Sequence, residues 1–399
     1  MELLMSAGKD PLRVAIIGTG RRADYYHGPL LRLLSDEVEL VSIWGRSNDS
    51  AKKLGNSLNV PWYTNLDKLI KETKPIIGIV CVGGGPPLHR ANGPIGIMAV
   101  EHGLHVLLET PIAHKLSDAD EIIRIADKKG LKIEVAEQFY RRPLEQIKLK
   151  LIATGLFGRI YSSFNDFEGH DYHGVSVMRS YFGFDTKPIK VTGFVRDYDL
   201  GDQCAQAFLS NEISKYGTRT ETQEHGIIEF SDGKLGIHHW SNVSYNSPIR
   251  WWRSSRFLGE KGMGISIKNG DVKEEILTLL TSSGESLRPI TIKRYLERLD
   301  GGGLQSIVAY TGDSEYPIVK WENPFRSKKP GHGLPLDDDA IGVASCIMSL
   351  VEAVRNNKEP EYGPHQARLD QEITIAIRQS SLQGGKPITL PFDPQAQTV

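Results

Sequence analysis

The densest group of chemically active side chains lies in the run Glu168-Gly-His170-Asp171-Tyr172-His173. Imidazole titrates near neutral pH, so His173 is the main candidate for a general acid or base. His170, Asp171 and Tyr172 are candidates for a second proton carrier or for orienting that histidine. The alternative is that these side chains cap a helix and bind solvent. No metal is expected here, because neighbours this close on a turn do not by themselves converge on one ion.

A glycine motif, Gly18-x-Gly20-x-x-Ala23, follows an apolar run and opens a helical pattern. Gly18 permits a tight turn, Gly20 lets the backbone approach a pyrophosphate, and the small Ala23 lets the helix pack on the strand. The N-terminus of that helix, which contains Arg21 and Arg22, would present free N–H groups to the anion. The motif predicts a bound NAD or NADP, held tightly in one reading. The alternative is a turn with only a structural role.

The end of the second predicted strand bears on the choice of dinucleotide. An acidic residue there usually holds the ribose hydroxyls of NAD, but the strand Val38–Trp44 is followed by Gly45-Arg46-Ser47. Arg46 and Ser47 could bind a 2′-phosphate, which a carboxylate would repel. This composition favours NADP. An arginine that only stacks on the adenine would leave NAD equally open.

Two arrangements of predicted elements carry these residues. Short apolar strands alternate with helical patterns at first, and Ile76–Val82 is almost wholly apolar, as in a strand buried on both faces of a parallel sheet. This predicts an α/β Rossmann domain with a doubly wound parallel sheet over residues 1–136. Residues 137–399 are expected to form an α+β domain with a large, mostly antiparallel sheet. Within it, Gly270–Leu336 is expected to be less regular, as a lid or an oligomer arm.

The bulk composition excludes several classes of protein. The 399 residues are 39% hydrophobic and 24% charged, which is typical of globular proteins. The 48 Lys+Arg and 49 Asp+Glu leave a formal charge of -1, so nucleic-acid binding is not expected. No apolar run is long enough to span a membrane, and the N-terminus lacks the pattern of a signal peptide. Three widely spaced cysteines argue against a disulfide framework. We therefore expect a cytoplasmic protein.

Taken together, the motifs resemble the glucose–fructose oxidoreductase / inositol dehydrogenase (Gfo/Idh/MocA) family over nearly the whole chain. The segments that carry the resemblance are Gly18–Ala23, Val82–His89, Gly103–Pro111, Glu137–Pro143 and Leu258–Gly264. The resemblance implies an NAD(P)-dependent enzyme that acts on sugars, cyclitols and related polyols. It also implies that the cofactor is contacted by Gly83, His89, Glu109 and Pro111.

The chain departs from this family at two positions. In typical members a lysine between Glu and Pro serves as the proton carrier, supported by an Asp and a His four residues apart. Here Thr110 occupies the lysine position, and aligning the helix of the second domain places the His at His173 and the Asp at Gly169. A neutral threonine can bind a substrate but cannot take a proton near pH 7. The base must therefore come from elsewhere.

Further residues are expected at the substrate pocket, namely Gln138, Tyr140 and Arg141 together with Thr110. An arginine there could bind an anionic substituent such as a carboxylate or sulfonate. The alternative for the arginine is a solvated position on the surface.

Three functions remain open on the sequence. The first is a sugar or glycoside oxidoreductase that transfers a hydride between nicotinamide and a ring carbon, C3 being favoured. The second is a redox-neutral glycoside hydrolase that oxidises, eliminates, hydrates and reduces its substrate, such as an anionic sulfoquinovoside. The third is an inactive dinucleotide sensor. The aromatic and basic run Arg250-Trp251-Trp252-Arg253, together with the resemblance, predicts a homodimer or homotetramer formed through the C-terminal sheet.

Overall fold

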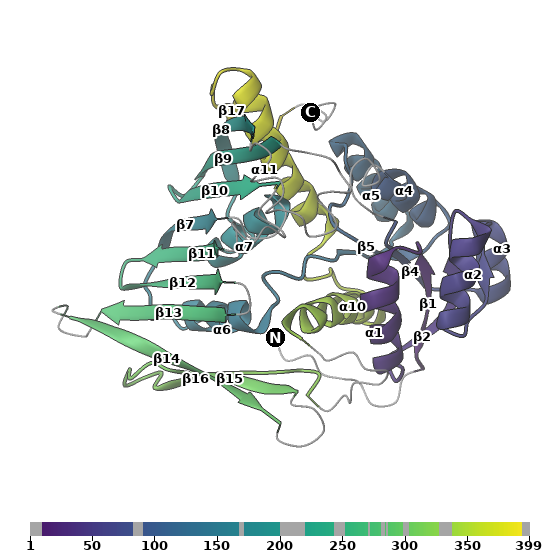
Figure 1. Cartoon of the computed structure of the whole chain (residues 1–399), viewed down its shortest axis with the longest axis horizontal. Coiled ribbons are helices and arrows are strands. Elements are labelled where there is room, and N and C mark those ends of the chain that lie inside the picture. The colour runs from purple at the N-terminus through teal and green to yellow at the C-terminus, as the bar shows by residue number, and fades with distance from the viewer. Residues whose placement is uncertain are drawn as a thin grey trace.

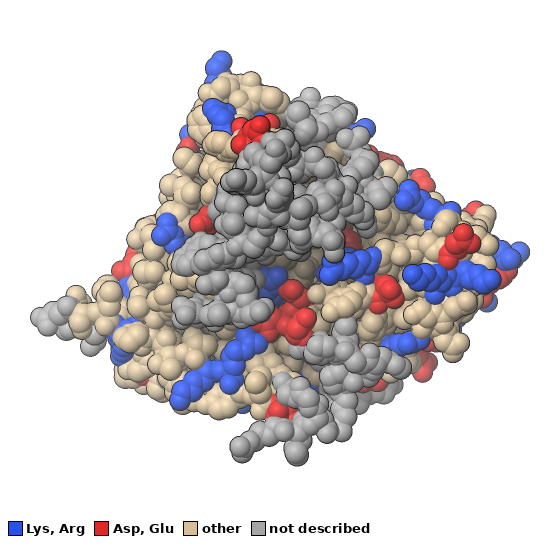
Figure 2. Space-filling model, in the orientation of Figure 1, with Lys and Arg blue, Asp and Glu red and all other residues tan. Residues whose placement is uncertain are grey.

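The computed structural model contains two large sheets, one built from each half of the chain (Figure 1). It describes residues 10–82, 91–166, 171–199, 220–242, 252–269, 272–280, 284, 286–297, 303–326 and 337–392. Within these residues, no helix is both long and apolar enough to cross a membrane. On the face shown in Figure 2, acidic and basic side chains are interspersed rather than gathered into a field of one sign.

The first sheet is parallel throughout and has the strand order β3-β2-β1-β4-β5-β6. Its strands are β1 Leu12–Ile17, β2 Val38–Trp44, β3 Trp62–Tyr63, β4 Ile77–Val80, β5 His105–Leu108 and β6 Ile133–Val135. The order reverses between β1 and β4, and ligands of such sheets bind in the crevice beyond the carboxyl ends of the strands at that point. The predicted doubly wound sheet is confirmed.

Helices connect these strands on both faces of the first sheet (Figure 1). They are the π-helical segment η1 Ala23–His27, α1 Gly28–Leu33, α2 Asn48–Ser57, α3 Leu66–Thr73, α4 Asn92–Glu101 and α5 Leu116–Lys129. β4 is buried along its whole length, as its apolar sequence requires.

The second sheet has eleven strands in the order β16-β15-β14-β13-β12-β11-β7-β10-β9-β8-β17. Its strands are β7 Ile160–Asp166, β8 Pro188–Asp199, β9 Thr220–Phe230, β10 Leu235–Ser241, β11 Trp252–Gly259, β12 Gly262–Asn269, β13 Val272–Leu280, β14 Leu287–Leu296, β15 Leu304–Tyr310, β16 Ile318–Glu322 and β17 Ile388–Thr389. All neighbours are antiparallel except β7 and β10, so the expected mostly antiparallel sheet is confirmed.

One expectation for this half is wrong. The stretch expected to be irregular, Gly270–Leu336, contains the regular strands β13 to β16, which extend the sheet (Figure 1). The strands were not predicted because the stretch is rich in glycine, serine and proline, which indicate loops when the pairing partner of a strand is unknown.

Among the described residues of the second half the helices are α6 Pro143–Ala153, α7 Asp171–Phe182, α10 Asp338–Asn356 and α11 Pro364–Leu382. Glycines let α7 lie close to the sheet, since a Cβ on Gly174 would lie 2.0 Å from the Asn165 amide and one on Gly236 would lie 2.2 Å from the Met178 sulfur. α10 instead packs on β5 and β6 of the first sheet, although it comes from the C-terminal part of the chain. The proposed division at residue 136 therefore separates the sheets but not every helix.

Candidate active site

The glycine turn lies at the switch point of the parallel sheet. Gly18 follows β1 directly with φ +137°, and its N–H donates to the Trp44 carbonyl at 2.9 Å. A Cβ on Gly18 would lie 2.2 Å from the carbonyl oxygen of Cys81, which follows β4. Only glycine fits this turn. The helix begins at Arg21, and a helix N-terminus at this point of the sheet can receive a pyrophosphate.

The end of β2 lies beside this turn, since a Cβ on Gly45 would lie 2.8 Å from the Thr19 methyl. Arg46 and Ser47 are both exposed there. The Ser47 hydroxyl caps α2 by accepting from the Ser50 N–H at 3.3 Å. Arg46 makes no hydrogen bond or ion pair with any described residue, so its guanidinium is available to an anion.

Glu109, at the end of β5, connects the cofactor side to the segment that carries Thr110. Its Oε1 lies 2.8 Å from Arg22 Nε and 2.6 Å from His27 Nε2. Burial opposes ionisation, but the Arg22 guanidinium and His27 outweigh it and lower the pKa of Glu109 to about 2. Asn92 donates to the carbonyls of Glu109 and Pro111 at 3.0 Å each. Two residues from the cofactor prediction, Arg22 and Glu109, are thus brought together.

A small pocket joins this segment to the second half of the chain. Its lining comes from the ends of β5 and β6, from α7 and from α11, and consists of Thr110, Pro111, Ile112, Val135, Glu137, Tyr172, Tyr362, Ala367, Asp370 and Gln371. Asp370 is held by the Tyr362 hydroxyl and by Arg179 Nη1, the latter at 2.5 Å. The predicted residues Thr110 and Tyr172 therefore line the same pocket, although 62 positions separate them in the chain.

His173 lies next to this pocket, in the first turn of α7, and is buried. Its Nδ1 is 2.6 Å from Glu137 Oε2, and its ring stacks on Phe139 with centroids 4.0 Å apart. Sequence reasoning assigned no role to Glu137. The available signal was a charged residue just beyond the carboxyl end of a parallel strand, where ligand sites of such sheets lie.

Asp171 is the first residue of α7 and does not line the pocket. It forms an ion pair with Arg378, which also contacts Glu224 at 2.9 Å. Burial raises the pKa of Glu224 to about 7 against the opposing effect of Arg378. Asp171 also accepts from the Tyr172 N–H at 2.9 Å. Its contacts are those of a helix-start cap and a buried ion pair.

Tyr140 and Arg141 lie in the interior and not on the lining of the pocket. Arg141 Nη2 contacts Glu134 Oε1 at 2.6 Å, and its Nε donates to the Tyr140 hydroxyl at 2.9 Å. Burial raises the pKa of Glu134 to about 8 although Arg141 opposes the change. Gln138 is also buried, and its amide oxygen has no partner among the described residues. The substrate roles of these three residues stay predictions.

Three predicted site residues, Gly83, His89 and His170, lie outside the described part of the chain. Among the residues that are described, no group of three or more His, Cys, Asp or Glu side chains is arranged to hold a metal ion. His27 was missed by the sequence prediction, because one histidine in a helical stretch carries no signal of its own.

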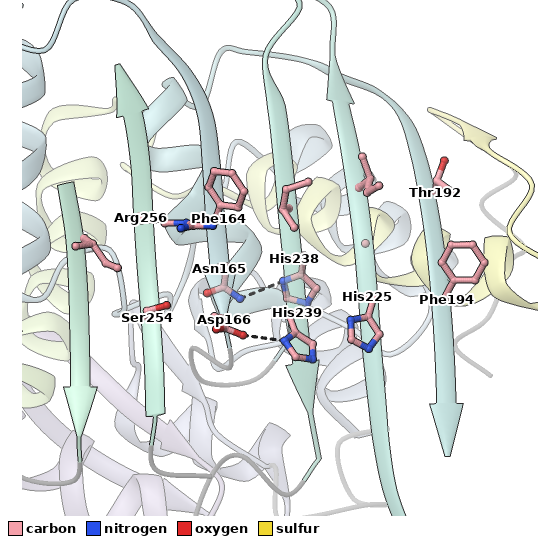
Figure 3. Close-up of a pocket in the computed structure, with 14 residues that line it drawn as sticks. Phe164, Asn165, Asp166, Thr192, Phe194, His225, His238, His239, Ser254 and Arg256 are labelled. Atoms are coloured by element: carbon pink, nitrogen blue, oxygen red, sulfur yellow. Dashed lines mark hydrogen bonds and ion pairs between the residues drawn. The ribbon is translucent and has the colours of Figure 1, made fainter. Parts of the chain in front are cut away.

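The face of the second sheet opposite α7 and α11 has an open concavity of about 510 Å³ (Figure 3). His225 and His239 stack there with ring centroids 4.3 Å apart, and His239 Nδ1 is 2.8 Å from Asp166. The Arg256 guanidinium lies 3.9 Å above the centroid of Phe164. His238, the neighbour of His239, points to the other face and contacts Asn165.

Comparison with known proteins agrees with this geometry. Residues 12–137 match the model of an oxidoreductase family with an NAD-binding Rossmann fold. An uncharacterised oxidoreductase of Schizosaccharomyces pombe is 30% identical over 213 residues, which are 52% of this chain and 52% of that protein. The D-glucoside 3-dehydrogenase of Escherichia coli is 31% identical over 153 residues, covering 38% of this chain and 42% of the relative. The chain thus spans about half the length of the curated relatives it matches.

Solved structures extend the likeness in fold to almost the entire chain. The WlbA dehydrogenase from Bordetella pertussis, solved with NADH and UDP-GlcNAcA, is 16% identical with a TM-score of 0.66, and the match covers 96% of this chain and 99% of that one. The aldose-aldose oxidoreductase from Caulobacter crescentus is 15% identical with a TM-score of 0.64, covering 95% and 100%. At these identities the likeness shows the fold alone.

Proposed function

Residues 12–137 match the Gfo/Idh/MocA oxidoreductase family, and from this premise we propose that the chain transfers a hydride between NAD(P) and a ring-hydroxyl carbon of a sugar or glycoside. The observation that carries the proposal is the contact between Arg22 of the glycine turn and Glu109, the residue before Thr110. It joins the dinucleotide turn to the wall of the pocket that Thr110 shares with Tyr172. The name of the related D-glucoside 3-dehydrogenase supports C3 as the oxidised carbon.

The residues fit a dinucleotide. The turn at Gly18 leaves no room for a side chain, and the helix that follows presents its N-terminus at the switch point. When bound, the nicotinamide supplies the hydride acceptor or donor. The exposed Arg46 supports NADP as the preferred form, because a guanidinium binds a phosphate in bidentate fashion.

The proton of the substrate hydroxyl needs an acceptor within hydrogen-bond reach. We assign this role to His173, with Tyr172 as the residue that passes the proton or orients the hydroxyl. Thr110 can hold the hydroxyl by a hydrogen bond but does not change charge near pH 7. Glu109 cannot serve, since its carboxylate is occupied by Arg22 and His27.

A redox-neutral glycoside hydrolase is the second candidate. The observation that favours it is the absence of lysine from the described lining of the pocket, where Thr110 stands in its place. In this reaction the cofactor ends each cycle unchanged, and a base removes the C2 proton after oxidation at C3. Tyr172 or His173 would perform that step.

The test is to incubate the purified protein with NAD or NADP and a panel of free sugars and aryl glycosides, and to follow reduced nicotinamide and released phenol together. Nicotinamide reduction without release of phenol is expected for the oxidoreductase. Release without net reduction, abolished when the cofactor is stripped, would establish the hydrolase instead. No signal in either channel, with dinucleotide binding intact, would contradict both and favour a sensor.

We further propose that the outer face of the second sheet is the interface of a homodimer or homotetramer. Phe194 and Ile227 are 41% and 43% exposed on this face. Large apolar side chains that lie together in contact with water are typical of an interaction surface. Arg256, whose guanidinium lies over the Phe164 ring, and the partly exposed Asp166 offer opposite charges to a second copy. Ile227→Lys should lower the oligomeric state measured by analytical ultracentrifugation. An unchanged sedimentation coefficient would contradict this interface. The side chains of residues 250–253, which were also predicted at the interface, lie outside the described part of the chain.

A further inference from the structure

The carboxylate of Glu137 contacts the imidazole of His173 across 36 positions of the chain, with 2.6 Å between Oε2 and Nδ1. Both side chains are buried, at 1% and 4% exposure. The other carboxylate oxygen, Oε1, accepts a hydrogen bond from the backbone N–H of Phe139 at 3.0 Å. Each oxygen therefore has its own partner, and the carboxylate cannot turn without losing one of them.

The imidazole plane is fixed as well. Phe139 stacks on His173 at an interplanar angle of 17°, and Tyr172 approaches it edge-on with centroids 4.5 Å apart. The Arg142 guanidinium lies 3.8 Å from the Phe139 ring centroid and is itself held by Asp339 at 2.7 Å. A ring held on its face, at its edge and at Nδ1 has little freedom to flip.

We propose that Glu137 is a positioning residue that holds His173 in the tautomer protonated at Nδ1, so that Nε2 is the proton acceptor of the reaction. A carboxylate can only accept hydrogen bonds, so the ring nitrogen facing it must donate. A neutral imidazole with its proton on Nδ1 carries its lone pair on Nε2. The inference rests on the proposed function, in which the hydroxyl proton passes to Nε2 while the C–H on the same carbon leaves as hydride to the nicotinamide.

The carboxylate nearest to His173 in the sequence among the described residues has other partners. Position 169 is a glycine, and Asp171 is engaged by Arg378 and by the Tyr172 N–H. The orienting acid therefore comes from the end of β6, in the other sheet. This gives the chain an acid–histidine pair despite the threonine at position 110.

The first test needs neither substrate nor cofactor. In protein labelled with ¹⁵N-histidine, the ring nitrogen shifts and couplings of His173, assigned by their loss in His173→Asn, show which nitrogen carries the proton. We expect protonation at Nδ1 at neutral pH. Protonation at Nε2 alone in the wild-type protein would overturn the proposal.

The second test is Glu137→Gln, which preserves size. The amide oxygen should stay on the Phe139 N–H, so the NH₂ group would face His173 and donate to Nδ1, which moves the ring proton to Nε2. We expect the NMR signature to invert and kcat to fall about 10²- to 10⁴-fold with little change in KM. Glu137→Asp keeps the carboxylate and should recover part of kcat, with an altered pH profile. Glu145→Gln changes another buried glutamate, which contacts Lys148, and should leave the His173 signature unchanged.

The two tests separate this inference from the proposed function. If Glu137→Gln inverts the tautomer but kcat stays at the wild-type value, the positioning role is wrong while the proposed function stands. If wild-type His173 is protonated at Nδ1 and no sugar or glycoside is converted, the proposed function fails while control of the tautomer by Glu137 is supported.

Discussion

The dinucleotide turn and the proton-transfer pair are built in opposite ways. The turn uses backbone groups from a few consecutive residues. Its defining feature is that Gly18 has no side chain, so the backbone of Cys81 can approach it closely. The pair uses two side chains that are 36 positions apart and come from different halves of the fold. A contiguous backbone motif can be recognised in a sequence, whereas a side-chain pair of this kind becomes visible only when the chain is folded.

The two regions should also respond differently to substitution. The turn is held by main-chain hydrogen bonds such as Gly18 N–H to the Trp44 carbonyl, so added volume should damage it more than a changed functional group. The pair depends on which atoms donate and which accept, so changes that conserve volume should be the damaging ones there.

The largest effect is expected for Gly18→Ala. The new Cβ would lie 2.2 Å from the Cys81 carbonyl oxygen at a φ that L-residues rarely adopt. Strain and overpacking of this kind cost on the order of 4 kcal/mol. We expect loss of NAD(P)H binding in a fluorescence titration and a lower Tm. Gly103→Ala is the matched control, since it also has positive φ but nothing within 4 Å of the added atom. Equal losses in both variants would contradict the role of the close approach.

Next in size is His173→Asn, which removes the proposed proton acceptor. We expect turnover to fall about 10²- to 10⁴-fold while the Kd for NAD(P)H stays the same. His102→Asn, at a partly exposed histidine paired with Asp67, is the control and should leave turnover unchanged. Wild-type turnover in His173→Asn would remove this residue from the reaction.

Glu109→Gln tests the contact between the two regions through its pH dependence. The folded pKa of Glu109, about 2, lies below the ordinary value of 4.5 for a glutamate, so the unfolded chain binds the proton first as the pH falls. The stabilisation, about 3 kcal/mol at most, is therefore complete above about pH 4.5 and is lost as the pH falls toward 2. In urea unfolding, the difference in the free energy of unfolding between wild type and variant should become smaller as the pH falls from 4.5 toward 2. The exposed Glu39→Gln is the control, and a gap that does not depend on pH would contradict the assignment.

The smallest effect is expected for Arg46→Ala. Loss of one charge-assisted contact to a 2′-phosphate costs about 1.5–3 kcal/mol. The KM for NADP should rise about tenfold or more while the KM for NAD changes little. Lys53→Ala, at an exposed residue of the following helix, is the control. Equal changes for both dinucleotides would show that Arg46 does not discriminate between them.

Sequence patterns predicted most of the architecture. The alternation of apolar runs and helical patterns predicted the parallel sheet. The turn Ser231-Asp232-Gly233, where Gly233 has φ +80°, is typical of the hairpin that joins β9 and β10. The pattern failed for β13 to β16, whose strands are recognised only through their pairing. It also gave no hint that α10, late in the chain, would cover β5 and β6 of the first sheet.

The candidate site divides in the same way. The motif Gly18–Ala23 and the segment that contains Glu109 were predicted to lie at the cofactor, and the structure brings Arg22 of that motif into contact with Glu109. Tyr140 and Arg141 are buried around Glu134, and their predicted place beside the substrate stays a prediction. A strand end tells which residues come near an edge of the sheet, but the direction of each side chain depends on the helices packed against it.

By itself the sequence determined the parallel sheet, the glycine turn and the absence of lysine at position 110, because periodicity, backbone freedom and residue identity are local properties. Only the tertiary structure decided that Glu137 would orient His173 and that Asp171 would be held by Arg378 instead. Both are choices among carboxylates of the same chemistry. Which carboxylate reaches His173, and which cation pairs with Asp171, depends on the elements that pack against α7, and that packing depends on the whole fold.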